Sequence, residues 1–188
     1  MIAFLDCDDI WMPEKLVNQV NIIMQEGTDL GLVYGQCLVI KSGFEATSKW
    51  ANRQYKYTKE TILKILPEGH VFEKLLKFNF IPLVTAIVSR KAYNEVGGIS
   101  NHFEQAEDYE LFLKIAAKRK IRAVQDVIAL YRIHESNISI GKDKKAFQEV
   151  IEIIDKYHND KVVCRGLSYQ HTAYALILIK DGNYMKGI

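Results

Sequence analysis

IAFLDCDD, at residues 2–9, joins a short apolar run to three carboxylates within four residues. The apolar residues 2–5 predict a buried β-strand, and the acids mark its carboxyl end, where the strand meets solvent. Pro13 follows a few residues later, in a position that suits the first turn of a helix. The sequence therefore predicts a strand and a helix that are joined by an acidic loop.

The acidic loop has two interpretations. Asp6, Asp8 and Asp9 repel one another unless they are solvated or bound to a cation, and Mg²⁺ or Mn²⁺ would relieve that repulsion. The structural alternative is a solvated acidic turn in which Asp9 caps the following helix, since caps of this kind are common. The spacing alone does not decide between a metal site and a cap.

Helical and strand patterns alternate along the rest of the chain. Apolar residues at helical spacing predict a helix from Pro13 to about Gly27, and they are Leu16, Val17, Val20, Ile23 and Met24. Strand composition predicts a strand or hairpin at 30–40, a strand-like segment at 81–88 and a strand pair at 121–131. Helical patterns occupy 60–66, 71–78, 89–96, 107–118, 144–157 and 168–180, and an irregular, substrate-facing loop is expected at 42–57.

A second carboxylate pair, Glu107 and Asp108, falls in the first turn of the helix expected at 107–118. A carboxylate beside another carboxylate has a raised pKa, which helps a general base to work near neutral pH. Acids in a first helical turn are also favoured by the helix dipole without any catalytic role. Both interpretations fit this pair when it is considered alone.

Further stretches of sequence help to decide between these interpretations. They are DIWMPEKL at 9–16, GGI at 97–99 with EDYEL at 107–111, and YRIHESNIS at 131–139. Together with DCDD they resemble family 2 glycosyltransferases of the GT-A fold. In that family a strand ends in Asp-Ser-Asp-Asp, then Trp and Pro-x-Lys-Leu follow, and a Gly-Gly turn later precedes a Glu-Asp pair that opens a helix. The resemblance covers residues 2–139, and the combination is specific although each short motif is weak. It implies an α/β, Rossmann-like GT-A fold.

The resemblance also implies a role for each acid. Asp6 would approach the ribose or uracil of a nucleotide-sugar donor, and Asp8 would coordinate the Mn²⁺ or Mg²⁺ ion that bridges the donor diphosphate, helped by Asp9. The ion would stabilise the leaving nucleoside diphosphate. Asp108 would be the general base that takes a proton from the acceptor hydroxyl in an inverting transfer, and Glu107 would contact acceptor or donor hydroxyls.

Arg132 and His134 follow a predicted strand and complete the expected donor site. Arg132 would bind phosphate, and His134 would reach the diphosphate or the metal ion. A lone histidine is more often structural, and the same holds for Trp11, which we expect in the core rather than stacked on a sugar.

Composition limits the partners and the setting. With 48% hydrophobic residues and 25 basic against 23 acidic residues, the chain predicts a packed core and gives no reason to expect nucleic acid. Three scattered cysteines suit neither a disulfide framework nor a zinc site, so a cytoplasmic location is expected. No apolar stretch approaches the ~20 residues that span a bilayer. Basic residues of the C-terminal helices could contact the inner face of a membrane, although a solvated basic helix explains them more simply.

The sequence departs from the family at its front. The family's N-terminal portion, which holds the nucleotide, is absent from residues 1–188, so we expect an N-terminally truncated domain with an unpaired sheet edge. Residues 1–140 would form the metal-binding and acceptor-side part, and residues 141–188 a C-terminal helical extension. Cys7 stands where the family usually has Ser, and this small change should leave the neighbouring carboxylates undisturbed.

The expected function is transfer of a sugar from a UDP-sugar to a saccharide or lipid-linked acceptor, in a setting such as bacterial surface polysaccharide synthesis. One alternative is an inactive remnant that binds carbohydrate through the aromatic-rich segment Trp50 to Tyr57. The other is a haloacid-dehalogenase-like phosphohydrolase, which also presents Asp-x-Asp at a strand end. The residues after Asp8 lack the small turn that this second family uses.

Overall fold

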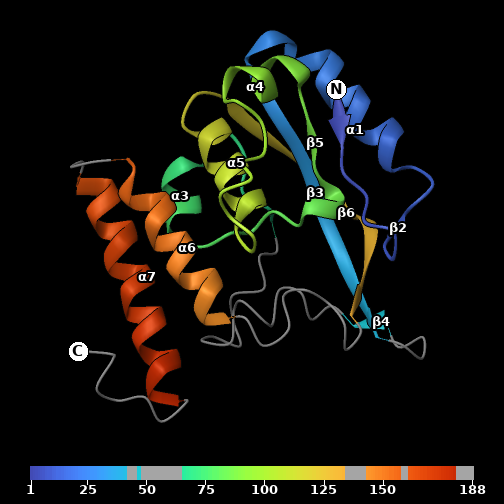
Figure 1. Ribbon diagram of the computed structural model, residues 1–188. Helices are drawn as coiled ribbons and strands as arrows, with labels where there is room; N and C mark the ends of the chain where they lie inside the picture. The colour runs from blue at the N-terminus through green and yellow to red at the C-terminus, as the bar shows by residue number, and fades with distance from the viewer. Residues whose placement is uncertain (42–45, 48–64, 134–142, 158–160, 181–188) are drawn as a thin grey trace.

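The fold is built on one mixed β-sheet with helices on both faces, as Figure 1 shows for the computed structural model, which describes residues 1–41, 46–47, 65–133, 143–157 and 161–180. The central strands β3 and β6 are parallel, and the other pairings are antiparallel. The strand order is β1-β5-β3-β6-β2, with β4 paired to β3. The strands are β1 (Ile2–Ala3), β2 (Ile10–Trp11), β3 (Leu30–Lys41), β4 (Ala46–Thr47), β5 (Ile87–Val88) and β6 (Lys120–Ile133).

The helices divide between the two faces of the sheet (Figure 1). Their bounds are α1 (Lys15–Glu26), η1 (Gly27–Asp29), α3 (Phe72–Lys77), η2 (Leu83–Thr85), α4 (Arg90–Glu95), α5 (Glu107–Ala116), α6 (Asp143–Asp155) and α7 (Lys161–Lys180). Because successive residues of a strand point to opposite faces, Leu32 of β3 packs with α5 while Val33 packs with Ile22 and Ile23 of α1.

The larger core lies between the sheet and the helices α3 to α7. Buried side chains of α5, such as Phe112, meet Leu75 and Leu76 of α3 and Ile153 and Ile154 of α6 in one continuous cluster. The C-terminal helices α6 and α7 therefore share the core of the residues before them. In the described part of the chain, no helix combines the length and the apolar character needed to cross a membrane.

Most of the predicted elements are confirmed. The helix after Pro13 ends at Gly27, which has a positive φ of 74°. Ser89 caps α4 by accepting the backbone N–H of Ala92, and Gly97 and Gly98 end this helix with positive φ angles of 80° and 69°. The α/β prediction is confirmed, and so are the strand at 30–40 and the helices near 71–78, 107–118 and 144–157.

Four predictions about elements are wrong. The first strand is not buried but is a short edge strand, so that Leu5 is half exposed. The segment 81–88 contains the short helix η2 and then a two-residue strand, because the backbone N–H of Thr85 donates to the backbone oxygen of Pro82. The strand pair at 121–131 is the single strand β6, and the last helix begins at Lys161 rather than 168.

The buried face of α1 is not the face of the apolar residues that predicted the helix. Lys15 and Gln19 are fully buried, whereas Leu16, Val17 and Met24 are exposed by 44%, 62% and 80%. Gln19 explains part of this arrangement, because its side-chain amide donates to the backbone oxygens of Val33 and Thr85. The segments expected at 42–57 and 60–66 lie almost wholly outside the described residues.

Candidate active site

The acidic loop connects the edge strand β1 to β2, which pairs with the far edge of β6. The backbone N–H of Asp9 donates to the oxygen of Asp6 at 3.2 Å, which closes a tight turn. Asp6 is exposed, Asp8 is half-buried and Asp9 is buried. The turn therefore presents its acids at different depths.

Asp9 and Arg132 join the acidic loop to the end of β6. An Asp9 side-chain oxygen, Oδ1, accepts the backbone N–H of Arg132 at 2.8 Å. Nε of Arg132 donates to the backbone oxygen of Asp8 at 2.9 Å. Arg132 therefore lies beside the acids of the loop, and His134 lies outside the described residues.

The acids of the loop are electrostatically unfavourable when ionised. The pKa of Asp9 is raised to about 6, mainly by burial and also by the charges of Asp8 and Asp6, while the N–H of Arg132 opposes the shift. Burial also raises the pKa of Asp6, with a further contribution from the Asp8 carboxylate. The expected mutual repulsion is thus present, and a bound cation would relieve it.

Glu107 and Asp108 occupy the first turn of α5, as predicted. The pKa of Asp108 is raised to about 7, first by burial and then by the Glu107 carboxylate, while hydrogen bonds from the Tyr109 N–H and the Asn79 side chain oppose this shift. Burial is also the main cause of the raised pKa of Glu107. Asp108 therefore has the properties of a carboxylate that can accept a proton near neutral pH.

Asp6 links the acidic loop to the pair on α5. Its charge contributes to the raised pKa of both Glu107 and Asp108, so the three carboxyl groups lie in one region of the molecule. These residues belong to segments that are far apart in the sequence but that the fold brings together. Asp8 and Asp9 lie next to Asp6 in the same turn.

The carboxylates suit a hard divalent cation. Among the described residues no group of three His, Cys, Asp or Glu side chains is close enough to hold a metal ion by itself. Mg²⁺ commonly uses one or two carboxylates together with substrate phosphates and water. Oδ2 of Asp9 is buried and has no hydrogen-bond partner in the described part of the chain, which leaves an oxygen that a cation would satisfy. The residues present therefore fit such an ion when a diphosphate supplies the remaining ligands.

Two polar residues at this site were missed by the sequence analysis. Asn79 hydrogen-bonds to Asp108, and its own Oδ1 accepts the N–H of Ile81 at 3.1 Å, which fixes the orientation of the amide. Glu149 of α6 contributes a charge that raises the pKa of Glu107. No local pattern connects either residue with α5, because both contacts span long stretches of chain.

Trp11 belongs to the packed part of the site. Its ring packs against the cluster of Cys37, Val84 and Ala129, and Nε1 donates to the backbone oxygen of Val84 at 3.0 Å. This environment agrees with the expected core position.

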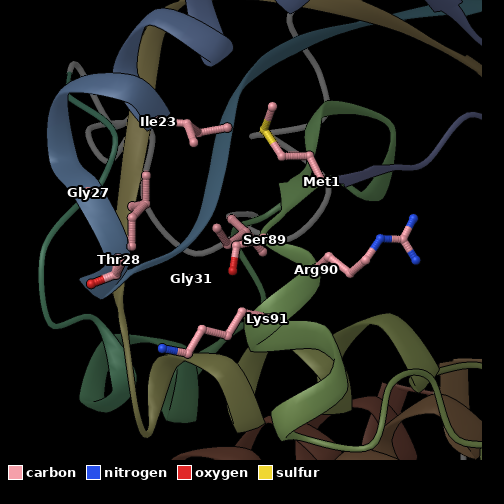
Figure 2. Close-up of a pocket in the computed structure, with 10 residues that line it drawn as sticks. Met1, Ile23, Gly27, Thr28, Gly31, Ser89, Arg90 and Lys91 are labelled. Carbon is pink, nitrogen blue, oxygen red and sulfur yellow. The ribbon is translucent and has the colours of Figure 1, made fainter.

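A surface hollow of about 260 Å³ lies elsewhere, at the amino ends of β1 and β3. Figure 2 shows Met1, Ser89 and Arg90 around it, with Ile23 of α1. None of the acids described above lines this hollow. It is therefore separate from the candidate active site.

Comparison with known families gives one match over nearly the whole chain. The model of the family described as glycosyltransferase like family 2 matches residues 1–180. The mixed sheet with helices on both faces agrees with the GT-A domain expected for this family.

Curated relatives carry glycosyltransferase names. The chain is 29% identical over 146 residues to the Escherichia coli UDP-Glc:alpha-D-GlcNAc-diphosphoundecaprenol beta-1,3-glucosyltransferase WfgD, with 77% of this chain and 50% of the relative covered. It is 27% identical over 166 residues to WfaP of the same organism, whose name gives the same activity, covering 87% of this chain and 58% of that protein. An uncharacterized glycosyltransferase of Nostoc is 27% identical over 192 residues, covering 93% and 57%. The chain thus spans about half the length of the curated relatives it matches.

Proposed function

Because the chain belongs to glycosyltransferase family 2, we propose that it transfers a sugar from a nucleoside-diphosphate donor to a hydroxyl group of a saccharide or lipid-linked acceptor, with inversion. The observation that carries this proposal is that the fold brings Asp6 near enough to Glu107 and Asp108 for its charge to raise the pKa of both. Asp6 is the residue expected to approach the donor, and Asp108 is the expected general base, so the two parts of the expected site lie near each other.

Asp108 acts as the general base. The acceptor hydroxyl gives its proton to the Asp108 carboxylate while its oxygen attacks the anomeric carbon from the face opposite the diphosphate. The bond between that carbon and the diphosphate oxygen breaks, and the nucleoside diphosphate leaves with the electron pair. A pKa of about 7 keeps Asp108 partly ionised and basic enough for this step. Glu107 binds hydroxyl groups of the acceptor or donor beside it.

The acidic loop and Arg132 hold the donor. Asp6 contacts the ribose or the base, and Asp8, assisted by the unpartnered Oδ2 of Asp9, holds Mn²⁺ or Mg²⁺. When bound, the ion supplies charge neutralisation for the leaving diphosphate. Arg132, which lies beside Asp8, contributes positive charge near the phosphates. We extend the same proposal to His134.

The relatives suggest the class of substrate. The names of the two Escherichia coli relatives give UDP-Glc as donor and a diphosphoundecaprenol-linked sugar as acceptor. We propose a UDP-sugar and a lipid-linked saccharide for this chain as well, used at the cytoplasmic face of a membrane in surface polysaccharide synthesis. Nucleic acid is not a proposed partner, because the charges of the chain nearly balance.

Calorimetric titration with UDP, with and without Mn²⁺, tests the donor site. We expect binding that requires Mn²⁺ and that is lost in Asp8→Ala. Asp126→Ala is the matched control, because Asp126 is an exposed acid on β6 outside the proposed site. Transfer from UDP-glucose to a synthetic GlcNAc-diphosphate lipid, and its loss in Asp108→Asn, then tests the chemistry.

The outcomes separate the alternatives. A folded chain that binds no UDP in the presence of Mn²⁺ is the inactive remnant, whose aromatic segment 50–57 lies outside the described residues. Release of phosphate from a simple phosphomonoester, lost in Asp6→Asn, would favour the dehalogenase-like activity, against which the family membership argues.

A further inference from the structure

The helix α6 contacts the loop that leads into α5, and one buried carboxylate makes that contact. Glu149 is only 8% exposed. Its Oε2 accepts the backbone N–H groups of Gln105 at 2.8 Å and Ala106 at 3.0 Å. Its Oε1 lies 3.3 Å from the N–H of Glu104, which also donates to it. Three consecutive backbone donors therefore share one side chain from a distant helix.

This contact fills a gap that the sequence leaves at the start of α5. Ala106 is the N-cap residue, and its side chain cannot accept a hydrogen bond. The N–H groups at a helix N-terminus need acceptors from elsewhere, and a negative charge is favoured there. Glu149 supplies acceptors to the residues immediately before the turn that carries Glu107 and Asp108.

The neighbouring ion pairs reinforce the same joint but are exposed. Nζ of Lys145 lies 2.5 Å from Glu104, and His102 lies 2.9 Å from Glu152 of α6. Pairs in such exposed positions contribute little, because solvent screens them. Among these polar contacts between α6 and the loop, the buried Glu149 carboxylate is therefore the one that should contribute most, beside the core packing of Phe103 and Ala106.

The helix α7 holds the other side of Asp108 in a similar way. Nε2 of Gln170 donates to the backbone oxygens of Leu76 and Lys77 at the end of α3, at 3.2 and 2.7 Å. Asn79, which hydrogen-bonds to Asp108, follows two residues later. Both C-terminal helices thus fix backbone that presents side chains to the carboxylate pair.

We propose that Glu149 is a positioning residue for the Glu107–Asp108 pair, which it holds by binding the backbone N–H groups that precede the first turn of α5. Through Glu149 the C-terminal helices become part of the scaffold of the active site. The catalytic meaning of this role rests on the proposed function of Asp108, but the positioning itself does not.

The charges around Glu149 allow a readout that goes beyond stability. The Glu149 carboxylate raises the pKa of Glu107, after the larger effect of burial. Lys145 Nζ, 4.0 Å away on the same helix, faces Glu149, and Glu104 faces Lys145 from the loop. Removing the charge of Glu149 should lower the pKa of Glu107, whereas a general loss of stability would not change that pKa in the folded protein.

The experiment compares Glu149→Gln and Glu149→Asp with the matched control Glu152→Gln, which removes an exposed carboxylate one turn further along α6. Amide hydrogen exchange is followed by NMR for the whole chain, and the carboxyl carbon of Glu107 is titrated. In Glu149→Gln we expect exchange at Gln105 and Ala106 to accelerate about tenfold, since the amide keeps one acceptor oxygen where the carboxylate has two, and the charge that strengthens the hydrogen bonds is lost. We also expect the pKa of Glu107 to fall.

Glu149→Asp keeps the charge, and it tests the proposal if Glu149→Gln does not fold. It should keep the raised pKa of Glu107 while exchange at Gln105 and Ala106 rises less. Unchanged exchange and an unchanged Glu107 pKa in Glu149→Gln would overturn the proposal, and so would equal effects in Glu152→Gln. If these readouts respond but the wild-type chain transfers no sugar, the proposed function fails while the positioning of the pair stands.

Discussion

Asp9 accepts a hydrogen bond of 2.8 Å from the backbone N–H of Arg132, a residue 123 positions further along the chain. The bond joins the acidic loop to the end of the central strand β6. Only Oδ1 of the carboxylate is used in this bond, and Oδ2 is buried without a partner. One acid therefore combines a structural bond with an oxygen that remains to be satisfied.

The two oxygens of Asp9 predict different effects for two substitutions. Asp9→Ala should destabilise the chain by about 1–3 kcal/mol, because the N–H of Arg132 loses its acceptor. Asp9→Asn keeps an acceptor for this N–H and removes the ionisable carboxyl group, whose pKa is raised to about 6. It should therefore be at least as stable as the wild type at pH 8. Urea unfolding measures both values.

The same two variants should behave alike toward the donor. If Asp9 assists the cation, both weaken Mn²⁺-dependent binding of UDP, although only Asp9→Ala is unstable. Asp126→Asn, on the exposed part of β6, is the control for removal of an acid. Equal destabilisation by asparagine and alanine would contradict the role of the Arg132 bond.

Because the pKa of Asp108 is raised in the folded chain, we expect the chain to become less stable as the pH rises. The Asp108 pKa is about 7 in the folded chain, mainly because of burial, against 3.8 as the ordinary value. The folded state therefore binds more protons than the unfolded state between these values, and the free energy of unfolding falls as the pH rises from about 4 to 7. Asp108→Asn should flatten this dependence, by an amount on the order of a few kcal/mol at most. Urea unfolding at several pH values measures it.

Other acids contribute with the same sign, so the comparison with the variant matters. Burial also raises the pKa of Asp6, Asp9 and Glu107. The difference between wild type and Asp108→Asn isolates the contribution of Asp108. A difference that stays constant from pH 4 to 8 would show that Asp108 titrates normally in the folded chain.

Local patterns predicted the elements that carry the site but not how they pack. The helix starting with Glu107 and a strand near the start of the chain follow from periodicity and composition, although that strand ends at Ala3 and lies at the sheet edge. Periodicity also located α1, yet it did not show which side chains are buried, since Lys15 and Gln19 are buried and Val17 is exposed. The spacing of apolar residues locates a helix and one apolar face on it. Which side chains are buried depends on the neighbouring elements, and these are set by the whole fold.

The misjudged strand pair has a similar physical reason. Gln125 and Asp126 are exposed polar residues inside an otherwise apolar run, and such a pair resembles a turn. In the structure the pairing passes from Gly35 opposite Val124 to Gln36 opposite Val127, so the extra residues form a bulge in one continuous strand. The contacts of Asn79 and Glu149 with the carboxylate pair were missed because they depend on tertiary structure alone.

Lys15 predicts the opposite pH dependence, at alkaline pH. Burial lowers its pKa from 10.5 to about 8; its Nζ lies over the ring of Trp11 and donates to Gln19. Between pH 8 and 10.5 the unfolded state binds more protons, so the free energy of unfolding should rise with pH in this range. In Lys15→Met the rise should disappear, because the thioether keeps the packing without a charge.

A matched control separates this effect from other lysines. Lys74→Met changes an exposed lysine of α3 and should retain the alkaline rise. Thermal unfolding at pH 7.5, 9 and 10 is sufficient for the comparison. If Lys15→Met retains the same slope as the wild type, Lys15 is charged and solvated in the folded chain.

The close approach of α7 to α3 gives the last prediction. A Cβ atom on Gly166 would lie 2.8 Å from the Cβ of Leu76 and 3.3 Å from its backbone oxygen. Alanine normally stabilises a helix relative to glycine by about 1 kcal/mol. Here the overpacking should prevail, so Gly166→Ala should destabilise the chain by about 1–3 kcal/mol.

Ser168→Ala, at an exposed position of the same helix, should leave stability unchanged or slightly higher. Because α3 leads to Asn79, NMR shifts in Gly166→Ala should extend to Asn79 and Asp108. Stabilisation by Gly166→Ala, as in an isolated helix, would mean that α7 does not pack against Leu76.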